Sequence, residues 1–346
     1  MKKTISVVIS AVMLLALFTG CGGSKTSNGV VNVYNWGEYI DTSLVTQFEN
    51  ETGIKVNYKT FESNEQMYSI LKQGGVSYDV VIPSDYMISR LISEDMLEPI
   101  DFNSVPNYSQ VENSLKNMAY DPDNKYSVPY MWGTMGIIYD PTVVGEVDSW
   151  SALFDEKNSG NILMFDNARD AMGIALKYLG YSLNTTDETE LNKAYELLKM
   201  QKPLLQGYVM DQIFDKLESG EAAIGPYYAG DYLTMHAENP KLKFCIPKEG
   251  SNMFSDAMCI LKNAGNKANA EAFINFMTGA QQSMANSKFI GYTSPNKEVK
   301  DVLDTDDFTK SIMYPDDATL AKCEVYINLP QATLDYYDQM WVKLKS

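Results

Sequence analysis

The sequence predicts an α/β protein with two lobes, in which parallel strands alternate with helices. Three observations support this expectation. The N-terminal part of the chain repeats a strand-then-helix pattern three times, which is typical of a parallel sheet with right-handed crossovers. The chain is 346 residues long, which favours two domains over one. No long linker separates two halves, so we expect the chain to cross between the lobes more than once.

The first strand and helix follow residue 29. Val30–Asn35 is rich in Val and Tyr, as strands are. Asp41 then provides a helix N-cap, and apolar residues repeat with a helical period up to Phe48. Gly53 ends this helix, because glycine favours the position just past a helix C-terminus.

The next two units continue the pattern. Ile54–Phe61 alternates apolar and polar residues and predicts a second strand. A helix begins near Asn64 and ends at Gly74-Gly75. Tyr78–Ile82 is a short apolar strand pattern, and Ser84–Met96 is the helix that follows it.

The later part of the chain alternates in the same way after a Pro-, Asn- and Tyr-rich stretch, Pro99–Tyr130, with weaker periodicity. We expect strands at Met131–Tyr139, Asn161–Asp166, Ala222–Gly225, Leu242–Ile246 and Ala257–Leu261. We expect helices at Ala168–Leu179, Glu188–Met200, Asp211–Glu218, Asp231–Ala237, Ala268–Met277, Gln281–Ser287 and Gln331–Leu344.

Composition excludes several classes of function. The chain has 45 Asp and Glu residues against 28 Lys and Arg, a formal net charge of −17. Nucleic-acid binding needs a basic face, so no nucleic-acid partner is expected. The single histidine, His236, makes His-rich metal sites and hydrolase triads poor candidates, and we expect it to be solvated.

The N-terminus resembles a bacterial lipoprotein export signal. Lys2-Lys3 precedes an apolar run, Ile5–Phe18, that is too short to span a bilayer, where about 20 residues are needed. Thr19-Gly20-Cys21 is similar to a lipobox. We therefore expect a signal peptide at 1–20, a lipidated Cys21 and a flexible tether over 21–29, which would place the protein on the outer face of the cytoplasmic membrane. Cleavage to a soluble periplasmic or secreted protein is the alternative.

Three further cysteines, Cys245, Cys259 and Cys323, show no close spacing that would suggest a metal site. Cys245 and Cys259 lie in apolar strand patterns, where buried free thiols are expected. The sequence leaves open whether Cys245 and Cys259 form a disulfide.

Ligands of open α/β sheets bind at the carboxyl ends of the strands, so we expect function in the segments that follow the strands. These segments combine aromatic and acidic residues: Trp36–Tyr39, Ser84–Tyr86, Phe165–Asp170, Pro226–Asp231, Met253–Asp256 and Gly291-Tyr292. Aromatic faces attract cations, and carboxylates accept charge-assisted hydrogen bonds from ammonium groups. Acids with aromatics between them suit a linear polyamine. Taken singly, each position also fits a structural role, as Asp85 and Asp166 fit helix N-caps.

A set of longer segments carries a specific resemblance. They are Tyr34–Tyr39, Glu49–Val56, Glu62–Tyr68, Tyr78–Ser84, Tyr126–Gly133, Pro247–Gly250, Gly291–Asn296 and Tyr314–Asp316. With these segments the chain resembles the bacterial periplasmic spermidine/putrescine-binding proteins, the substrate-capture subunits of polyamine ABC importers. The resemblance implies a type II periplasmic-binding-protein fold, whose two hinged lobes close like a Venus flytrap. It places lobe 1 at 30–132 plus 255–300 and lobe 2 at 133–254 plus 301–346.

The resemblance also implies the ligand contacts. The walls and hydroxyl groups would come from Trp36, Tyr39, Ser84, Tyr86, Tyr227, Phe254 and Tyr292. The acids would be Glu38, Asp170, Asp231 and Asp256, with Asp256 holding the inner amine. The partners implied are a polyamine, the permease subunits of an ABC transporter and the membrane through the lipid anchor. No cofactor, metal or catalytic residue is expected, and the protein is expected to be a monomer.

Some residues depart from the pattern of this family. Gly37 replaces a hydroxyl residue, and Asn167 stands where spermidine-preferring members have an acid. Tyr228–Asp231 instead resembles the putrescine-preferring branch. The choice between spermidine and putrescine therefore stays open.

Two alternative functions remain open, a ferric-ion-binding protein and a secreted glycosidase. The adjacent Tyr227 and Tyr228 are similar to the iron-binding tyrosines of ferric-ion-binding proteins of the same fold. A secreted glycosidase would use two carboxylates, such as Glu38 and Asp256.

Overall fold

The computed structural model describes residues 28–37, 39–62 and 64–346, so the expected signal peptide, Cys21 and most of the tether lie outside the described residues. Within that part, the strands are β1 (Val30–Trp36), β2 (Lys55–Phe61), β3 (Val80–Val81), β4 (Leu97–Glu98), β5 (Ser127–Tyr139), β6 (Ile162–Phe165), β7 (Leu205–Val209), β8 (Ile224–Tyr228), β9 (Lys243–Cys245) and β10 (Met253–Leu261). They form one sheet in the order β2-β1-β3-β10-β5-β8-β6-β7, with β4 beside β10 and β9 beside β5.

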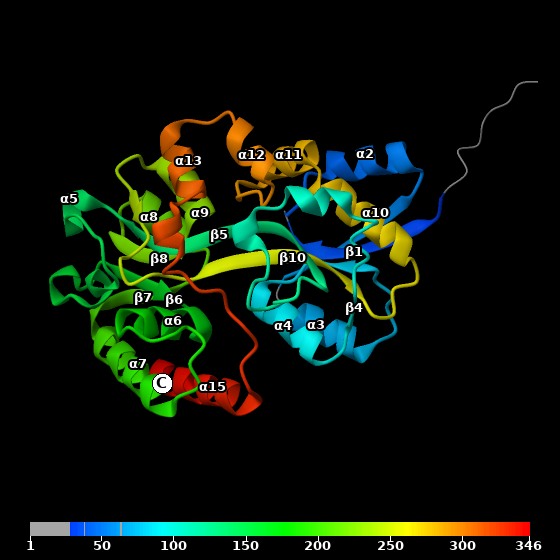
Figure 1. Cartoon of the computed structure of the whole chain (residues 1–346). Coiled ribbons are helices and arrows are strands. Elements are labelled where there is room, and N and C mark those ends of the chain that lie inside the picture. The colour runs from blue at the N-terminus through cyan, green and yellow to red at the C-terminus, as the bar shows by residue number, and fades with distance from the viewer. Residues whose placement is uncertain (1–27, 38, 63) are drawn as a thin grey trace, which may run out of the picture.

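Helices cover this sheet, and the predicted α/β fold is confirmed (Figure 1). They are α2 (Thr42–Thr52), α3 (Asn64–Gln73), α4 (Asp85–Ser93), α5 (Pro141–Val144), α6 (Ala168–Tyr178), α7 (Glu188–Gln201), α8 (Ile213–Glu218), α9 (Ala229–Glu238), α10 (Lys267–Thr278), α11 (Ala280–Ile290), α12 (Lys297–Val302), α13 (Asp307–Met313), α14 (Asp317–Leu320) and α15 (Gln331–Lys345).

One half of the sheet forms the core of lobe 1. β1 pairs in parallel with β2 and β3, which fits the expected crossovers. On one face Val31 and Val33 pack with Phe48 of α2 and Phe273 of α10. On the other face α3 and α4 contribute a second buried cluster that includes Leu91. A parallel sheet is stable when both faces are covered, and here both are.

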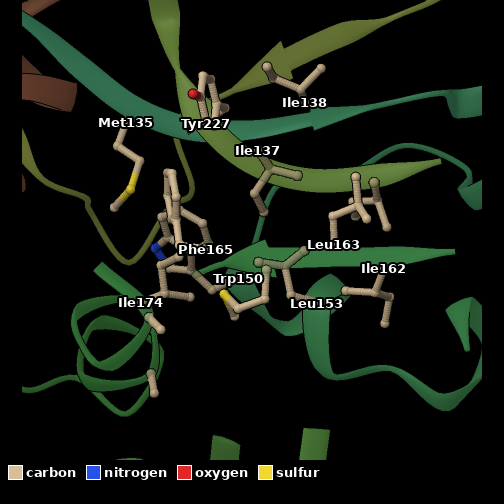
Figure 2. Close-up of a cluster of buried hydrophobic side chains, with 14 of the residues drawn as sticks. Met135, Ile137, Ile138, Trp150, Leu153, Ile162, Leu163, Phe165, Ile174 and Tyr227 are labelled. Carbon is tan, nitrogen blue, oxygen red and sulfur yellow. The ribbon is translucent and has the colours of Figure 1, made fainter. Parts of the chain in front are cut away.

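The other half of the sheet forms the core of lobe 2. β6 pairs in parallel with β7 and β8, and β8 pairs with β5 in the antiparallel sense. Figure 2 shows Trp150 and Phe165 among the aliphatic side chains between the strands and the helix that carries Ile174. The Trp150 indole Nε1 donates to the Gly250 carbonyl at 2.9 Å, so this buried polar atom is satisfied.

The chain passes between the lobes where β5 changes partners. Up to Thr134 the strand β5 pairs with β10, and from Met135 it pairs with β8 and β9. The return passage lies beside it, because the Met135 N–H donates to the Asn252 carbonyl at 3.0 Å. A third segment joins them there: the Glu324 N–H donates to the Ser251 carbonyl at 3.0 Å. The three passages therefore meet at one place, close to residues 132/133 and 254/255. That these positions are the boundaries between two lobes that move relative to each other stays a prediction.

The segment after residue 300 is shared between the lobes. Leu329 and Tyr337 belong to the core cluster that also contains Trp150 and Phe165. Tyr314 and Val325 instead pack in a core cluster of lobe 1. The assignment of the whole segment 301–346 to lobe 2 stays a prediction.

Some predicted elements differ from the observed ones. β5 begins at Ser127, earlier than the predicted Met131, and every residue of it is buried, which removes the alternation that marks a half-exposed strand. β10 begins at Met253, so Phe254–Asp256 lies inside a strand and not after one. β7 and the short helices α12 to α14 were not expected.

Two further expectations concern the described residues only. Cys245, Cys259 and Cys323 are free thiols there, so the open question of a Cys245–Cys259 bond is answered in favour of free cysteines. None of the helices in the described ranges combines the length and the apolar character that crossing a membrane requires.

Candidate functional site

A cleft of about 970 Å³ lies between the two lobes, at the carboxyl end of β1 and the amino ends of α4 and α6. Its described lining contains eight of the residues predicted for the site: Trp36, Tyr39, Ser84, Tyr86, Asp170, Phe254, Asp256 and Tyr292. The described part of the lining is strongly acidic, since it contains two guanidinium groups, of Arg90 and Arg169, and six carboxylates: Glu65, Asp85, Asp170, Asp211, Asp256 and Asp338.

A chain of aromatic rings forms one wall of the cleft. The Tyr39 and Tyr292 rings lie 5.7 Å apart, Tyr292 and Phe254 lie 5.8 Å apart, and Phe254 and Tyr228 lie 5.4 Å apart. All of these contacts are edge-to-face, the arrangement that aromatic quadrupoles favour. The Phe254 ring fits because its cross-strand neighbour is Gly133, where a Cβ would come within 2.6 Å of the ring. The wall therefore runs from lobe 1 into lobe 2 and offers flat faces to an alkyl chain or a cation.

Asp256 lies in the middle of this wall, inside β10. The Tyr39 hydroxyl donates to its Oδ2 at 2.7 Å, while its Oδ1 is buried and has no hydrogen-bond partner in the described residues. The register of β10 against β5 shifts between Asp256 and Ala257, and such a bulge re-aims side chains near functional sites. Burial raises the pKa of the Asp256 carboxyl, and the nearby Ser84 and Tyr39 hydroxyls partly offset this rise.

Asp85 is a second buried acid, from the first turn of α4. Its Oδ1 accepts from the Tyr86 N–H at 2.7 Å, and its Oδ2 has no partner in the described part of the chain. Burial raises the pKa of Asp85 well above its ordinary value, the Tyr86 amide opposes the rise, and repulsion from Asp256 adds to it. The helix N-cap is Ser84 and not Asp85, so the capping role considered for Asp85 does not apply.

Asp170 supplies the acid on the side of lobe 2. The Asn167 side chain accepts from the Asp170 N–H at 2.8 Å and so caps α6, which turns the Asp170 carboxylate into the cleft. Its oxygens accept from Asn167 Nδ2 at 2.8 Å, the Tyr326 hydroxyl at 3.1 Å and the Tyr228 hydroxyl at 3.2 Å. Burial raises the pKa of Asp170, and these three donors work against that rise. This carboxylate is thus held in place by lobe 2 itself.

Two predicted residues lie behind the wall and do not line the cleft. The Tyr227 hydroxyl donates to Asp211 Oδ1 at 2.9 Å, and its ring stacks on Phe165 in the core. At this strand end the cleft is lined by Tyr228. Asp231 accepts from the Tyr292 hydroxyl at 3.1 Å, which joins α9 of lobe 2 to a loop of lobe 1. Burial raises the pKa of Asp231 to about 6.

The lobe 1 rim of the cleft holds Tyr86. The Tyr86 hydroxyl donates to Glu65 Oε1 at 2.9 Å and accepts from Asn64 Nδ2 at 3.0 Å. Asn64 also accepts from the Ser84 N–H at 3.2 Å, so α3 positions both Ser84 and Tyr86. Glu38 lies outside the described residues, and its predicted role stays a prediction.

Sequence reasoning missed several lining residues, chiefly Asp85, Arg169, Tyr228, Tyr326 and Tyr337. The Arg169 guanidinium lies over the Tyr326 ring at 4.6 Å and the Tyr337 ring at 5.5 Å, and its Nη2 donates to Asn184 Oδ1 at 2.9 Å. Tyr326 and Tyr337 lie outside the βα units, in the segment that returns to lobe 2. Asp85 belongs to the strand-end segment Ser84–Tyr86, and this position is the sequence signal that indicates it.

The ferric-ion reading loses support from the two tyrosines. Iron coordination by tyrosine requires phenolates, whereas burial raises the pKa of both Tyr227 and Tyr228. Their hydroxyls donate to different carboxylates, those of Asp211 and Asp170. Among the described residues no cluster of three His, Cys, Asp or Glu side chains is arranged to hold a metal. His236 lies away from the cleft lining, half-buried, with Nδ1 2.9 Å from the Leu242 carbonyl oxygen.

Comparisons with known proteins agree with the geometry of the cleft. A family model for bacterial extracellular solute-binding proteins matches residues 43–316. The spermidine/putrescine-binding periplasmic protein of Salmonella typhimurium is 34% identical over 336 residues, 96% of each chain. The crystal structure of a spermidine/putrescine ABC transporter substrate-binding protein from Streptococcus pneumoniae, in complex with calcium and HEPES, matches with a TM-score of 0.84. It is 37% identical, and the match covers 92% of this chain and 98% of that one.

A lipoprotein of Treponema pallidum has the same fold, with a TM-score of 0.82, 30% identity and a match over 91% of this chain and 99% of that one. The family match spans more than half of the chain, and the relatives align over almost their whole length. The chain therefore belongs to the family of bacterial extracellular solute-binding proteins, which are not enzymes.

Proposed function

We propose that this protein captures a polyamine, spermidine or putrescine, outside the cytoplasmic membrane and delivers it to the permease of an ABC importer. The observation that carries the proposal is a pair of buried carboxylate oxygens in a cleft lined by aromatic rings. These atoms, Asp85 Oδ2 and Asp256 Oδ1, have no hydrogen-bond partner among the residues that the structure describes. An unpartnered buried carboxylate oxygen is destabilising, and an ammonium group from a ligand satisfies it with a charge-assisted hydrogen bond. The names of the relatives in Salmonella and Streptococcus point to the same ligand class.

The geometry supports capture by closure of the two lobes. Asp85 and Asp256 line the cleft on the lobe 1 side, and Asp170 lines it on the lobe 2 side. A ligand that contacts both sides is bound more tightly by the closed form, and this difference in affinity drives the closure. Closure also excludes water, which strengthens each contact between an acid and an ammonium group. The alkyl segments of the ligand would lie against Tyr39, Tyr292 and Phe254.

Titration calorimetry with putrescine, spermidine and spermine tests the proposal. An affinity near micromolar corresponds to about −8 kcal/mol, which a few acid contacts and several aromatic faces supply after ordering costs. The matched control ligand is 1,4-butanediol, which keeps the carbon chain of putrescine and lacks its charges. Heat with at least one polyamine and none with the diol is the expected result. Absence of heat with all three polyamines contradicts the proposal.

We also propose that Cys21 is lipidated and anchors a monomeric protein to the outer face of the cytoplasmic membrane. The lipobox-like segment Thr19-Gly20-Cys21 and the Gly- and Ser-containing tether support this proposal. Mass spectrometry of the N-terminal peptide from membrane fractions should show a diacylglyceryl Cys21, and Cys21→Ser should release the protein from the membrane. An unmodified N-terminus at another residue contradicts the anchor. Light scattering on the protein without its leader tests the monomer.

A further inference from the structure

Asp85 and Asp256 present two buried carboxylates to the same cleft. Asp85 is 1% exposed and Asp256 is 7% exposed. In each carboxylate one oxygen accepts a hydrogen bond and the other has no partner in the part of the chain that the structure describes. A buried charge without a partner costs far more than a buried neutral group, so the unliganded arrangement requires a proton or a cation.

The groups around Asp85 do not neutralise it. It faces Asp256 of β10, the backbone amide of Tyr326, the buried phenol of Tyr120 and the guanidinium of Arg169. Repulsion from Asp256 affects the pKa of Asp85 more than the opposing attraction of Arg169 does. The Arg169 guanidinium is held against lobe 2 aromatic rings, as described above, and makes no ion pair with Asp85 within 4.0 Å.

The groups around Asp256 are neutral hydroxyls. The Tyr39 hydroxyl donates to Asp256, and Ser84 lies beside it as its partner in an isolated β-bridge. The phenols of Tyr292 and Tyr130 lie close enough to interact electrostatically with its carboxylate. Burial raises the pKa of both Asp85 and Asp256. The groups around Asp85 and Asp256 therefore supply no positive charge that balances two ionised carboxylates.

We propose that Asp85 and Asp256 form one paired-carboxylate subsite, which holds a single proton in the unliganded protein and exchanges it for an ammonium group of the ligand. The exchange is balanced in charge. The O–H bond of the carboxylic acid breaks, the proton passes to solvent, and the N–H donors of the entering ammonium group satisfy the two free oxygens. The inference rests on the proposed polyamine function and adds Asp85 to the residues that bind the ligand.

The exchange predicts how affinity depends on pH. The ligand binds the doubly ionised pair, so the association constant should rise with pH wherever the free pair still holds its proton. Release of one proton corresponds to a rise of up to about tenfold per pH unit. Above that range the pair is already ionised, and the affinity should level off.

Calorimetry in two buffers measures the exchange directly. Putrescine is titrated at the same pH in phosphate and in imidazole, whose ionisation enthalpies differ, and the difference in heat gives the protons released per ligand. The wild-type protein should release up to one proton at some pH between about 5 and 8. Asp85→Asn should release less than half of that number, show a flatter pH profile, and bind at least tenfold more weakly above the pH at which wild-type affinity levels off.

Three variants make the result specific. Asp85→Glu keeps a carboxylate and should restore the proton release. Asp231→Asn removes another acid with a raised pKa near the cleft, so it should leave the release from the pair in place. Asp148→Asn changes an exposed acid outside the cleft lining that pairs with Lys248, and it should match the wild type.

Infrared difference spectra of the wild-type protein give a test that needs no variant. Addition of putrescine should remove the C=O band of a protonated carboxyl group. Binding without proton release and without this spectral change overturns the inference, as does unchanged release in Asp85→Asn. Absence of polyamine binding by the wild-type protein would instead overturn the proposed function, so the two failures are distinguishable.

Discussion

At Asp256, one oxygen accepts from the Tyr39 hydroxyl at 2.7 Å, and the other is buried without a hydrogen-bond partner in the described residues. Asp256→Asn keeps the volume of the side chain and an oxygen for Tyr39 while it removes the charge. We expect polyamine affinity to fall by more than tenfold, which corresponds to about 1.4 kcal/mol or more. Calorimetry measures this loss, with Asp148→Asn as the control at an exposed acid. Unchanged affinity would remove Asp256 from the site.

We expect Asp231 to make the free energy of unfolding depend on pH, because burial raises its pKa from 3.8 to about 6 in the folded protein. The folded state therefore keeps a proton that the unfolded state has lost, between about pH 4 and pH 6. The contribution of Asp231 to stability is present in full below this window and is lost as the pH rises through it. Asp231→Asn removes this titration and can still accept from Tyr292.

The measurement is urea unfolding of the wild type and Asp231→Asn at two pH values. At pH 8 we expect the variant to have the larger free energy of unfolding, because it avoids burying a charge. Near pH 4 the two proteins should be equal. The same difference at both pH values would show that Asp231 does not titrate as described.

At the scale of elements, the next prediction concerns Gly250, which lies between β9 and β10 and contacts the segment at Lys322. Gly250 has φ +87°, and a Cβ there would lie 2.0 Å from the Lys322 carbonyl oxygen, in the third passage between the lobes. Gly145 has φ +78°, but a Cβ there would meet no atom within 4 Å. Gly145→Ala should therefore cost about 1 kcal/mol of backbone strain, and Gly250→Ala should cost more than about 3 kcal/mol.

Urea unfolding of both glycine variants checks this difference. The matched pair separates the strain of a positive φ, which both positions share, from the steric conflict between two passages, which only Gly250 has. Equal losses of stability would mean that the contact between residues 250 and 322 is not tight.

Elements with a local pattern were predictable from the sequence, and elements defined by distant neighbours were not. β1 and β2 have residue patterns typical of strands, and α2 has a helical period with the capping residues Asp41 and Gly53 at its ends. The predicted and observed bounds of these three elements therefore agree closely. β5 is buried along its whole length because β10, β8 and β9 all pair with it, and these partners come from distant parts of the chain. A strand of this kind has no period-2 signal.

The candidate site shows the same limit. The aromatic and acidic residues at strand ends were found, because the carboxyl ends of parallel strands share one edge of the sheet. For Asp85 the sequence left two interpretations open, a place in the acidic and aromatic segment Ser84–Tyr86 and a helix N-cap. Its significance comes from Asp256, which β10 brings beside it through an antiparallel pairing with β3. Tyr326 enters the cleft from the return segment, whose path no local pattern indicates.

At the scale of the whole molecule, the net charge of −17 and the ligand site are separate matters. Most of the ion pairs in the described residues lie on exposed surfaces, such as Lys248 with Asp148, and these contribute little to stability. The acids that carry the functional argument are buried and face one cleft. An acidic composition alone therefore favours solubility, and the placement of a few carboxylates among aromatic rings indicates the cation.

The two lobes have separate cores and meet at the three passages and across the cleft, which makes a final prediction about cooperativity. Without ligand, differential scanning calorimetry should show a broad transition, because each lobe loses only modest support when the other unfolds. A ligand that contacts both lobes is released when either one unfolds, so saturating putrescine couples them. At a thousandfold excess over Kd the added stability is about 4 kcal/mol. We expect a higher Tm and a narrower transition with putrescine, and no change with 1,4-butanediol. If putrescine raised the Tm of only one of two resolved transitions and narrowed neither, it would bind a single lobe. That result would contradict the proposed closure of the lobes around the polyamine.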